Sequence, residues 1–296
     1  MEDISTPNPP KRRRPFLRGC LTVLVVLAAF FLLLLAISRM GDISLSGGGK
    51  VAVIPVSGMI TSSDSVIDQL KKFGKDDSVK AIVLRINSPG GGVAPSQEIH
   101  EEVGKLSAKK PVLASMGAVA ASGGYYIAAA TRKVYANPGT MTGSIGVVMP
   151  FVNAKDLVEK IGIRGMAVKS GQFKDIGSPL RDMTPEERVV LQSVVDNVHL
   201  QFVNAVARGR KLPPEEVLKI ADGRIFTGEQ AKALGLVDAL GNLEDTVEAA
   251  ARMGGITGEP RVIMPPKSKI SMLDLIREEM SSLINEKIMG YPLELN

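Results

Sequence analysis

The sequence predicts an α/β domain built around a mostly parallel β-sheet. Short apolar runs rich in β-branched residues alternate along the chain with amphipathic stretches, and this alternation is typical of strands joined by crossover helices. Hydrophobic residues make up 45% of the 296 residues, which is enough to form a core and too many for a disordered chain. Crossovers between such strands are expected to be right-handed.

The first part of this domain is expected to run in the order strand, helix, strand, helix, strand. Buried strands are predicted at 51–56, 80–86 and 112–116, because these runs are apolar and rich in β-branched residues. Amphipathic helices are predicted between them, at 64–73 and 95–106. The alternation therefore favours parallel pairing of the three strands.

The second half of the chain predicts one long helix with a strong start. Thr184 can act as the N-cap, with Pro185 in the first turn and Glu187 placed to complete a capping box. The helix should end near Gly209. Its expected core-facing side chains recur at helical spacing: Leu191, Val195, Val198, Phe202 and Val206.

Shorter elements flank this long helix. A helix-like stretch at 152–161 and a strand-like stretch at 165–169 precede it. A further helix is expected after residues 227–229, and residues 240–242 predict a turn.

The N-terminal region predicts a membrane anchor. Residues 19–38 form a run of twenty residues without a charge, which as a helix would be about 30 Å long and would cross the hydrocarbon core. The alternative is a cleaved signal peptide, but its apolar region is usually only about 7–15 residues long. Basic residues within 11–18 should stay cytoplasmic, which places residues 40–296 on the other side of the cell membrane.

The chain is therefore expected to contain five segments. A cytoplasmic basic tail at 1–18 precedes the single-pass anchor at 19–38, and a Gly/Ser linker at 39–50 follows. The α/β domain covers 51–250, and a C-terminal extension covers 251–296.

Composition excludes several classes of function. The first eighteen residues hold +3 of the formal net charge of +5, tryptophan is absent, and no basic stripe interleaved with aromatics follows, so nucleic acid is not an expected partner. A single cysteine, Cys20, excludes an intrachain disulfide and a Cys-cluster metal site. His100 on a solvated helix face and His199 within a helix make a zinc site or a histidine triad a poor interpretation.

Three Gly/Ser-rich loops follow apolar strands, where ligands gather in α/β sheets. Consecutive glycines at 87–92 can form a nest for an oxyanion, although a tight turn is the alternative. The loop 120–126 places Ser122 before a helix-like run, either as a nucleophile near the helix dipole or as a simple N-cap. It lacks the G-x-S-x-G pattern of a nucleophile elbow. The loop 140–147 holds Ser144, which is interpreted as a turn serine because a strand is expected to follow.

A nucleophilic serine needs a base, and lysine is the remaining candidate. An ordinary lysine, with a pKa of about 10.4, is neutral in roughly one molecule in 2,500 at pH 7, so it must be desolvated to serve. Lys174 lies beside Phe173 in a glycine-containing loop, but an ordinary exposed loop lysine is an open alternative. The neighbouring Asp175 would favour the charged amine, and Lys110 lies in a polar connection.

Several longer motifs resemble the short form of the signal peptide peptidase A family, in order over about residues 50–250. The resemblance implies a Clp-protease/crotonase-like fold. It also implies a membrane-anchored serine endopeptidase with a Ser–Lys dyad that degrades remnant signal peptides after preprotein cleavage. The motifs are INSPGGG at 86–92, SMGAVAASGGYYIA at 115–128, TGSIGV at 142–147, SGQFKDIGSPLRDMTPEER at 170–188 and GRIFTGEQAKALGLVDALG at 223–241.

Matched residue by residue, the resemblance implies that Ser122 is the nucleophile and Lys174 the general base. It implies an oxyanion hole formed by Gly91, preferred over Gly90, together with Gly123. It implies no metal and no cofactor. The implied partners are signal peptides and other apolar peptides, the lipid membrane, and further copies of the chain. These copies would form a dome-shaped ring, with an octamer as one candidate size, in which adjacent subunits supply serine and lysine.

Because signal peptides are apolar, small and aliphatic side chains should line the groove near Ser122, with Val93, Val119 and Ile145 as candidates. Two other functions stay open. An acyl-CoA-binding crotonase-like enzyme would share the fold, but the anchor and the lack of a basic nucleotide patch argue against it. A catalytically inactive membrane scaffold is disfavoured by the intact motifs around Ser122 and Lys174.

Overall fold

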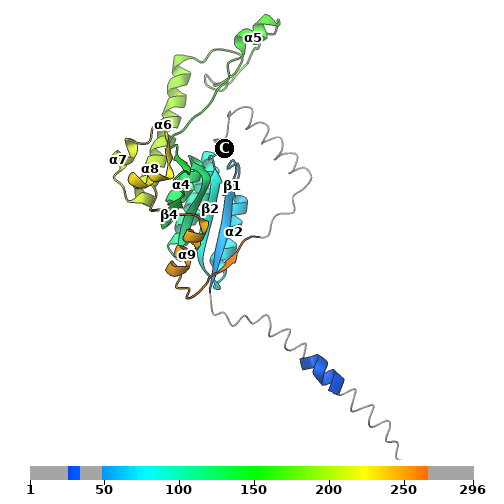
Figure 1. The fold of residues 1–296 in the computed structure, drawn as a ribbon. Helices are drawn as coiled ribbons and strands as arrows, with labels where there is room; N and C mark the ends of the chain where they lie inside the picture. Colours follow the sequence, from blue (N-terminus) through cyan, green and yellow to red (C-terminus); the bar gives the residue numbers. More distant parts are fainter. Residues whose placement is uncertain (1–25, 34–48, 266–296) are drawn as a thin grey trace, which may run out of the picture. The chain divides into compact units, whose positions relative to one another are not determined.

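The computed structural model describes residues 26–33 and 49–265 (Figure 1). Residues 26–33 are helical, and within these two ranges no helix is both long and apolar enough to cross a membrane. Some expected segments lie wholly or largely outside the described residues: the basic tail at 1–18, the anchor at 19–38, the linker at 39–50, and the C-terminal extension beyond residue 265.

A sheet of eight strands forms the centre of the α/β domain (Figure 1). Along the sheet the strands follow the order β6-β5-β3-β2-β1-β8, with β4 pairing with β3 and with β7. The pairings are parallel except between β5 and β6. The strands are β1 (Lys50–Ser57), β2 (Val79–Ser88), β3 (Val112–Ala121), β4 (Lys133–Ala136), β5 (Met141–Gly143), β6 (Ile225–Thr227), β7 (Ala239–Leu240) and β8 (Arg261–Ile263).

Helices cover both faces of the sheet. The alternation of side chains along β1 sends Ala52 and Ile54 to a face packed by α2, α3, α4 and the end of α6, and sends Val51 and Val53 to a face packed by α9. The helices are α2 (Asp64–Lys75), α3 (Val93–Ser107), α4 (Gly123–Ala129), α5 (Lys155–Lys160), α6 (Pro185–Arg210), α7 (Pro214–Leu218), α8 (Gly228–Ala233) and α9 (Leu243–Met253).

The elements expected in the first part of the domain are confirmed. The three expected strands form β1, β2 and β3, and the two expected helices between them form α2 and α3. At the start of α6, Glu187 N–H donates to Thr184 Oγ1 at 3.2 Å, and Thr184 N–H donates to Glu187 Oε2 at 2.9 Å. The capping box is therefore present. Helix α9 was missed, although Asn242 and Asp245 form a similar capping box.

Residues 148–200, called the arm below, differ most from the expectations. No strand forms at 165–169, and α5 is shorter than the expected 152–161. Only the last part of α6 packs on the core: Phe202 and Val206 are buried, whereas Val195 and Val198 of the expected stripe are half-buried. In Figure 1 the arm extends away from the sheet, so most of its apolar residues do not pack on the core formed by residues 49–265.

Candidate active site

Ser122 lies at a sharp turn between β3 and α4. Strand β3 ends at Ala121 and α4 begins at Gly123, so a single residue carries the chain from strand to helix. Ser122 has φ 51° and ψ −120°, a region that residues with a Cβ rarely adopt and that costs about 1–3 kcal/mol. Strain of this kind persists where the surrounding structure imposes it, and it clusters at active sites.

Two backbone hydrogen bonds hold this turn in place. Ser122 N–H donates to the carbonyl of Gly143 at 2.9 Å, and Tyr126 N–H donates to the carbonyl of Ser122 at 2.8 Å. A serine on a strained strand-to-helix turn has the geometry of a nucleophile elbow. Sequence reasoning missed the elbow because the G-x-S-x-G pattern is absent, although the small neighbours Ala121 and Gly123 were a usable signal.

The glycines of the loop after β2 allow this loop to pack directly on the Ser122 turn. A Cβ added to Gly90 would lie 2.8 Å from both Gly123 N and Ser122 Cβ. Gly90 also has φ +107°, which glycine adopts without strain. On the other side of the turn, a Cβ on Gly124 would lie 2.9 Å from the carbonyl of Ser88. The two segments can therefore approach this closely only without side chains.

The backbone N–H groups beside Ser122 differ in whether they already donate a hydrogen bond. Gly90 N–H donates to Ser88 Oγ at 3.1 Å, so it is already used. Among residues 49–265, Gly91 N–H has no hydrogen-bond acceptor. Gly123 N–H belongs to the first residue of α4, where the helix itself provides no acceptor. Gly91 and Gly123 thus offer donors for an oxyanion, and this geometry favours Gly91 over Gly90.

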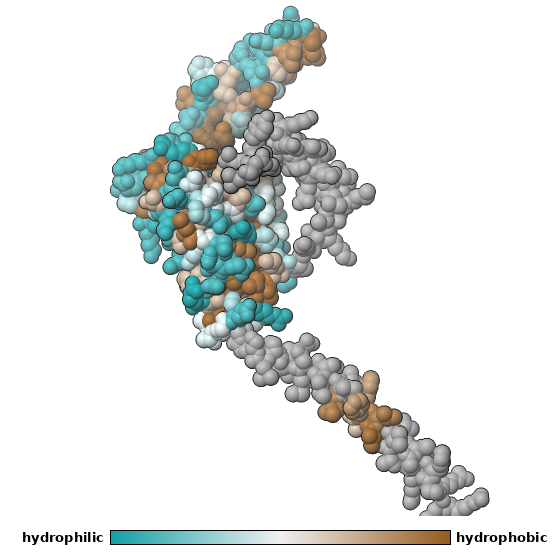
Figure 2. All heavy atoms as spheres, in the orientation of Figure 1, coloured by the Kyte–Doolittle hydropathy of each residue, from teal (hydrophilic) through white to brown (hydrophobic). Residues whose placement is uncertain are grey.

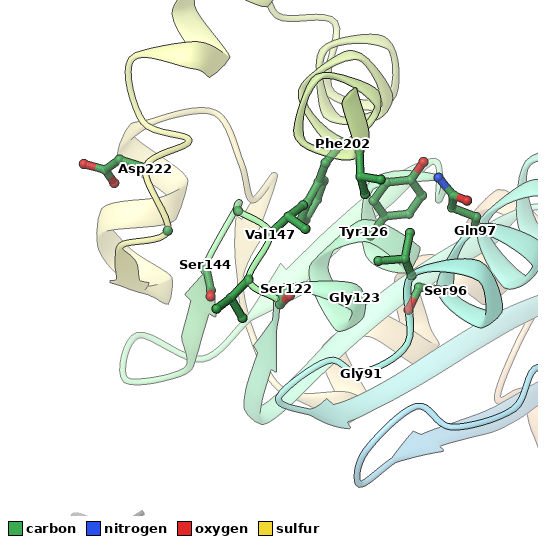
Figure 3. A pocket seen from close by; sticks show the side chains of 15 residues that line it. Gly91, Ser96, Gln97, Ser122, Gly123, Tyr126, Ser144, Val147, Phe202 and Asp222 are labelled. Carbon is green, nitrogen blue, oxygen red and sulfur yellow. The ribbon is translucent and has the colours of Figure 1, made fainter. Parts of the chain in front are cut away.

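A cavity of about 410 Å³ opens beside Ser122 (Figure 3). Its apolar wall comes from three helices and the segment after β5, and Tyr126 and Phe202 pack in it with ring centroids 4.9 Å apart. Polar side chains of Ser96 and Gln97 lie on the α3 side. The apolar wall consists of Val93, Tyr126, Val147, Val148, Val198 and Phe202.

The three expected groove residues have different positions. Val93 lines the cavity, as expected. Val119 is half-buried and does not line it. Ile145 is fully buried in the core and does not line the cavity, whereas its neighbours Gly146 and Val147 do. Sequence spacing alone does not show which side of an irregular segment faces the cavity.

His100 was expected on a solvated helix face, and the structure corrects this. Its ring packs against Tyr126 with centroids 4.8 Å apart. Burial, assisted by the charge of Arg208, lowers the pKa of His100. His100 does not line the cavity, so the described residues contain no histidine placed to activate Ser122.

Ser144 lines the same cavity as Ser122 (Figure 3). It has φ 49°, and its N–H donates to the carbonyl of Arg224 at 2.8 Å. The expectation that a strand follows Ser144 is wrong: β5 precedes it, and residues 144–154 form no strand. Ser144 therefore has a second strained backbone in the cavity, but it lacks the adjacent helix start that Ser122 has.

The candidate bases lie elsewhere in the single chain. Lys174 is exposed on the arm and does not line the Ser122 cavity. Lys110 Nζ donates to the carbonyl of Asp76 at 2.6 Å, so it is engaged in a different part of the fold. The acidic neighbour of Lys174 is also engaged: Asp175 pairs with Lys169 and Arg181. The candidate nucleophile and the candidate base therefore lie apart in the single chain.

Within the described part of the chain, no group of three or more His, Cys, Asp or Glu side chains could hold a metal ion. Comparison with protein families matches residues 104–257 to Peptidase family S49 and residues 50–143 to Clp protease. The second match agrees with the parallel sheet and its crossover helices.

Similar proteins carry related names. A Synechocystis protein described as a protease is 46% identical over 209 residues, which cover 70% of this chain and 75% of that protein. A protein described as a protease in Methanocaldococcus jannaschii is 36% identical over 247 residues, covering 78% and 79%. A protein named signal peptide peptidase SppA in Enterococcus faecium is 38% identical over 220 residues, covering 73% and 64%. The chain belongs to peptidase family S49 and is a serine protease.

Proposed function

We propose that this serine protease is a membrane-anchored endopeptidase that degrades remnant signal peptides with a Ser122–Lys174 dyad. The observation that carries the proposal is the Ser122 turn, which combines a strained nucleophile, two available N–H donors and an adjacent apolar cavity. Apolar peptides of the kind left by preprotein cleavage fit such a wall. The uncharged run at 19–38 would hold the enzyme beside them at the cell membrane, with its catalytic domain outside the cytoplasm.

The proposed reaction proceeds through an acyl-enzyme. Ser122 Oγ attacks the scissile carbonyl carbon while Lys174 Nζ accepts its proton. The carbonyl oxygen becomes an oxyanion that accepts hydrogen bonds from Gly91 and Gly123 N–H. The intermediate then breaks its C–N bond, and the leaving amine takes the proton from Lys174. Water next attacks the ester and again loses a proton to Lys174. The ester C–O bond then breaks, Ser122 Oγ takes the proton from Lys174, and the acid product leaves.

A neighbouring subunit is the proposed source of Lys174. The arm that carries Lys174 exposes many apolar side chains, and contiguous exposed apolar surface marks an interaction site (Figure 2). A head-to-tail contact through the arm would repeat from copy to copy and could close into a ring. Burial in that contact would also favour the neutral amine. The exposed arm residues are Val148, Met149, Phe151, Val152, Leu157, Ile161, Ile163, Met166, Val168, Phe173, Leu180, Val189, Val190, Val194 and Leu200.

Mixing two inactive variants tests both the dyad and its location. Ser122→Ala and Lys174→Ala subunits are each expected to be inactive alone. After co-assembly, an intact Ser122 should meet an intact Lys174 at about one quarter of the interfaces. Each of the two subunits at an interface carries the required intact residue with a probability of about one half. Peptide hydrolysis should return to about that fraction of wild type. A mixture that forms verified hetero-oligomers and stays inactive would place both residues of the dyad within one chain.

Charges on the arm should prevent assembly without unfolding the chain. Met166 and Val168 are fully exposed, so the double substitution Met166→Asp with Val168→Asp leaves the packing within the chain unchanged. If the arm packs on a neighbour, the buried carboxylates would weaken that contact strongly. Light scattering should then show a smaller particle, and peptide hydrolysis should fall with it. The matched control is Leu218→Asp on α7, which should change neither property, and an arm variant of wild-type size contradicts the proposed interface.

A further inference from the structure

Three charged residues tie the loop of Lys174 to the start of α6. We call Asp175, Arg181 and Glu187 the clamp. On the loop side, Arg181 Nε donates to Asp175 Oδ2 at 2.9 Å, and Arg181 Nη2 donates to the backbone carbonyl of Asp175 at 3.1 Å. Lys169 Nζ holds the other oxygen, Asp175 Oδ1, at 2.5 Å. The residue that follows Lys174 is therefore fixed at its side chain and at its backbone.

On the helix side, the same guanidinium grips Glu187. Arg181 Nη1 donates to Glu187 Oε2 at 2.9 Å, and Nη2 contacts the other carboxylate oxygen. Glu187 is 2% exposed and is the residue that closes the capping box with Thr184. It is thus anchored to the first turn of a 26-residue helix. The clamp therefore fixes the position of the Lys174 loop relative to α6.

All of the N–H donors of Arg181 are used in such contacts. A guanidinium has five N–H donors. Those of Arg181 go to Asp175, to Glu187 and to the carbonyl of Asp182, the last at 3.0 Å. A lysine at this position would offer a point charge and could not make the same fork to two carboxylates. The planar guanidinium of Arg181 therefore holds Asp175 and Glu187 in one fixed arrangement.

The clamp stays ionised at the pH where a lysine base would operate. Hydrogen bonds from Arg181 and Lys169 hold the pKa of Asp175 well below its usual range. Hydrogen bonds from Arg181 and from the Thr184 backbone lower the pKa of Glu187 to about 2. Because both carboxyl pKa values are depressed, the contribution of the clamp is present at neutral and alkaline pH and is lost only on strong acidification.

We propose that Arg181 is the positioning residue of the general base, holding the loop so that Lys174 reaches the nucleophile. The inference rests on the proposed function, in which Lys174 is the base. Residues 171–178 belong to no helix or strand, so regular secondary structure does not fix the course of this loop. A base must lie within about 2.6–3.2 Å of the hydroxyl that it deprotonates. A misplacement of about 1 Å can lower the rate about 100-fold.

The clamp has a second consequence for the same amine. A free carboxylate at Asp175 would stabilise the ammonium form of its neighbour, which is inactive as a base. Arg181 and Lys169 instead neutralise Asp175 from both sides. Removing Arg181 therefore both loosens the loop and leaves Asp175 freer to attract the Lys174 ammonium.

The test compares Arg181→Gln with Lys155→Gln in the full chain. Lys155 pairs with Asp182 at 2.7 Å on the same arm but does not touch the clamp, so it is the matched control. For Arg181→Gln we expect kcat at pH 7 to fall about 10–100-fold, with KM within about twofold. The rising limb of the pH–rate profile should move to higher pH, so that part of the activity returns at alkaline pH. Lys155→Gln should match wild type in all three respects.

A second variant covers the case in which Arg181→Gln does not assemble. Glu187→Gln keeps an amide oxygen that can accept from Thr184 N–H, so the capping box survives while the charge that Arg181 grips is lost. It should lower kcat with KM and particle size unchanged, while the pH–rate profile stays in place because Arg181 and Lys169 still neutralise Asp175. Arg181→Lys should recover only part of the rate, because one ammonium cannot bridge both carboxylates.

Each outcome separates the inference from the proposed function. If Lys174→Ala is inactive but Arg181→Gln keeps the wild-type kcat and pH–rate profile, Arg181 does not position the base and the dyad stands. If both clamp variants lose rate in proportion to lost assembly, with an unshifted profile, the clamp is only structural and the inference fails. If Lys174→Ala is fully active, the dyad itself is wrong and the inference falls with it.

Discussion

Replacing Ser122 with alanine is expected to lower kcat/KM for an apolar peptide on the order of 10⁶-fold, which is the loss found when a serine protease loses its nucleophile. Alanine keeps a Cβ in the same strained backbone, so the turn between β3 and α4 should form as before. What disappears is Oγ, and without it the acyl-enzyme cannot form. Steady-state hydrolysis and labelling with a fluorophosphonate both report this loss.

Ser144→Ala is the control for this prediction, because Ser144 lines the same cavity and has a similar positive φ. The label should remain in Ser144→Ala and be absent in Ser122→Ala. Circular dichroism should show that both variants are folded. Label that follows Ser144 instead would move the nucleophile to the other serine of the cavity and would contradict the role given to Ser122.

The second large effect is expected for Gly90→Ala. Its Cβ would lie 2.8 Å from Gly123 N and from Ser122 Cβ, so the loop after β2 and the Ser122 turn would have to separate. The φ of +107° would add strain of about 1–3 kcal/mol. Separation would move Gly91 N–H away from the developing oxyanion, and losing one such donor lowers kcat about 10²–10³-fold. Peptide hydrolysis measures the loss of kcat, and urea unfolding measures the loss of stability that the strain causes.

Gly104→Ala is the matched control for that substitution. Gly104 lies within α3, no atom lies within 4 Å of its added Cβ, and its φ is not positive. Alanine should therefore stabilise the helix by up to about 1 kcal/mol and leave hydrolysis unchanged. Wild-type hydrolysis by Gly90→Ala would show that the two segments do not need their close contact for activity.

Much of the fold follows from local patterns. The strands at 51–56, 80–86 and 112–116 are mostly apolar, and such runs are typical of strands that are buried on both faces. The start of α6 follows from Thr184, Pro185 and Glu187, whose side chains and ring satisfy or remove the free N–H groups of the first turn. These features depend on neighbours in the sequence and can be read from it.

The arm could not be predicted in the same way. Its apolar spacing resembles that of core helices and strands, so α6 was expected to face the core along its whole length. In the structure the stripe contacts the core only near Phe202 and Val206. Hydrophobic periodicity shows that the apolar face of a helix will be buried. It does not show whether the residues that bury this face come from the same chain.

The sequence alone was enough to name the candidate site residues: Ser122 among small residues, the glycines at 90–92, and Lys174 in its loop. It also indicated the α/β class. The candidate residues and the fold class can both be predicted because they depend on residue type and on spacing over a few positions. The tertiary structure was needed to show that, among residues 49–265, Gly90 N–H has an acceptor and Gly91 N–H has none. It was also needed to show that Ile145 is buried and that Arg181 joins Asp175 to Glu187. The reason is physical: hydrogen-bond partners, burial and strain are set by atoms distant in sequence, and only the packing of the whole domain brings these atoms together.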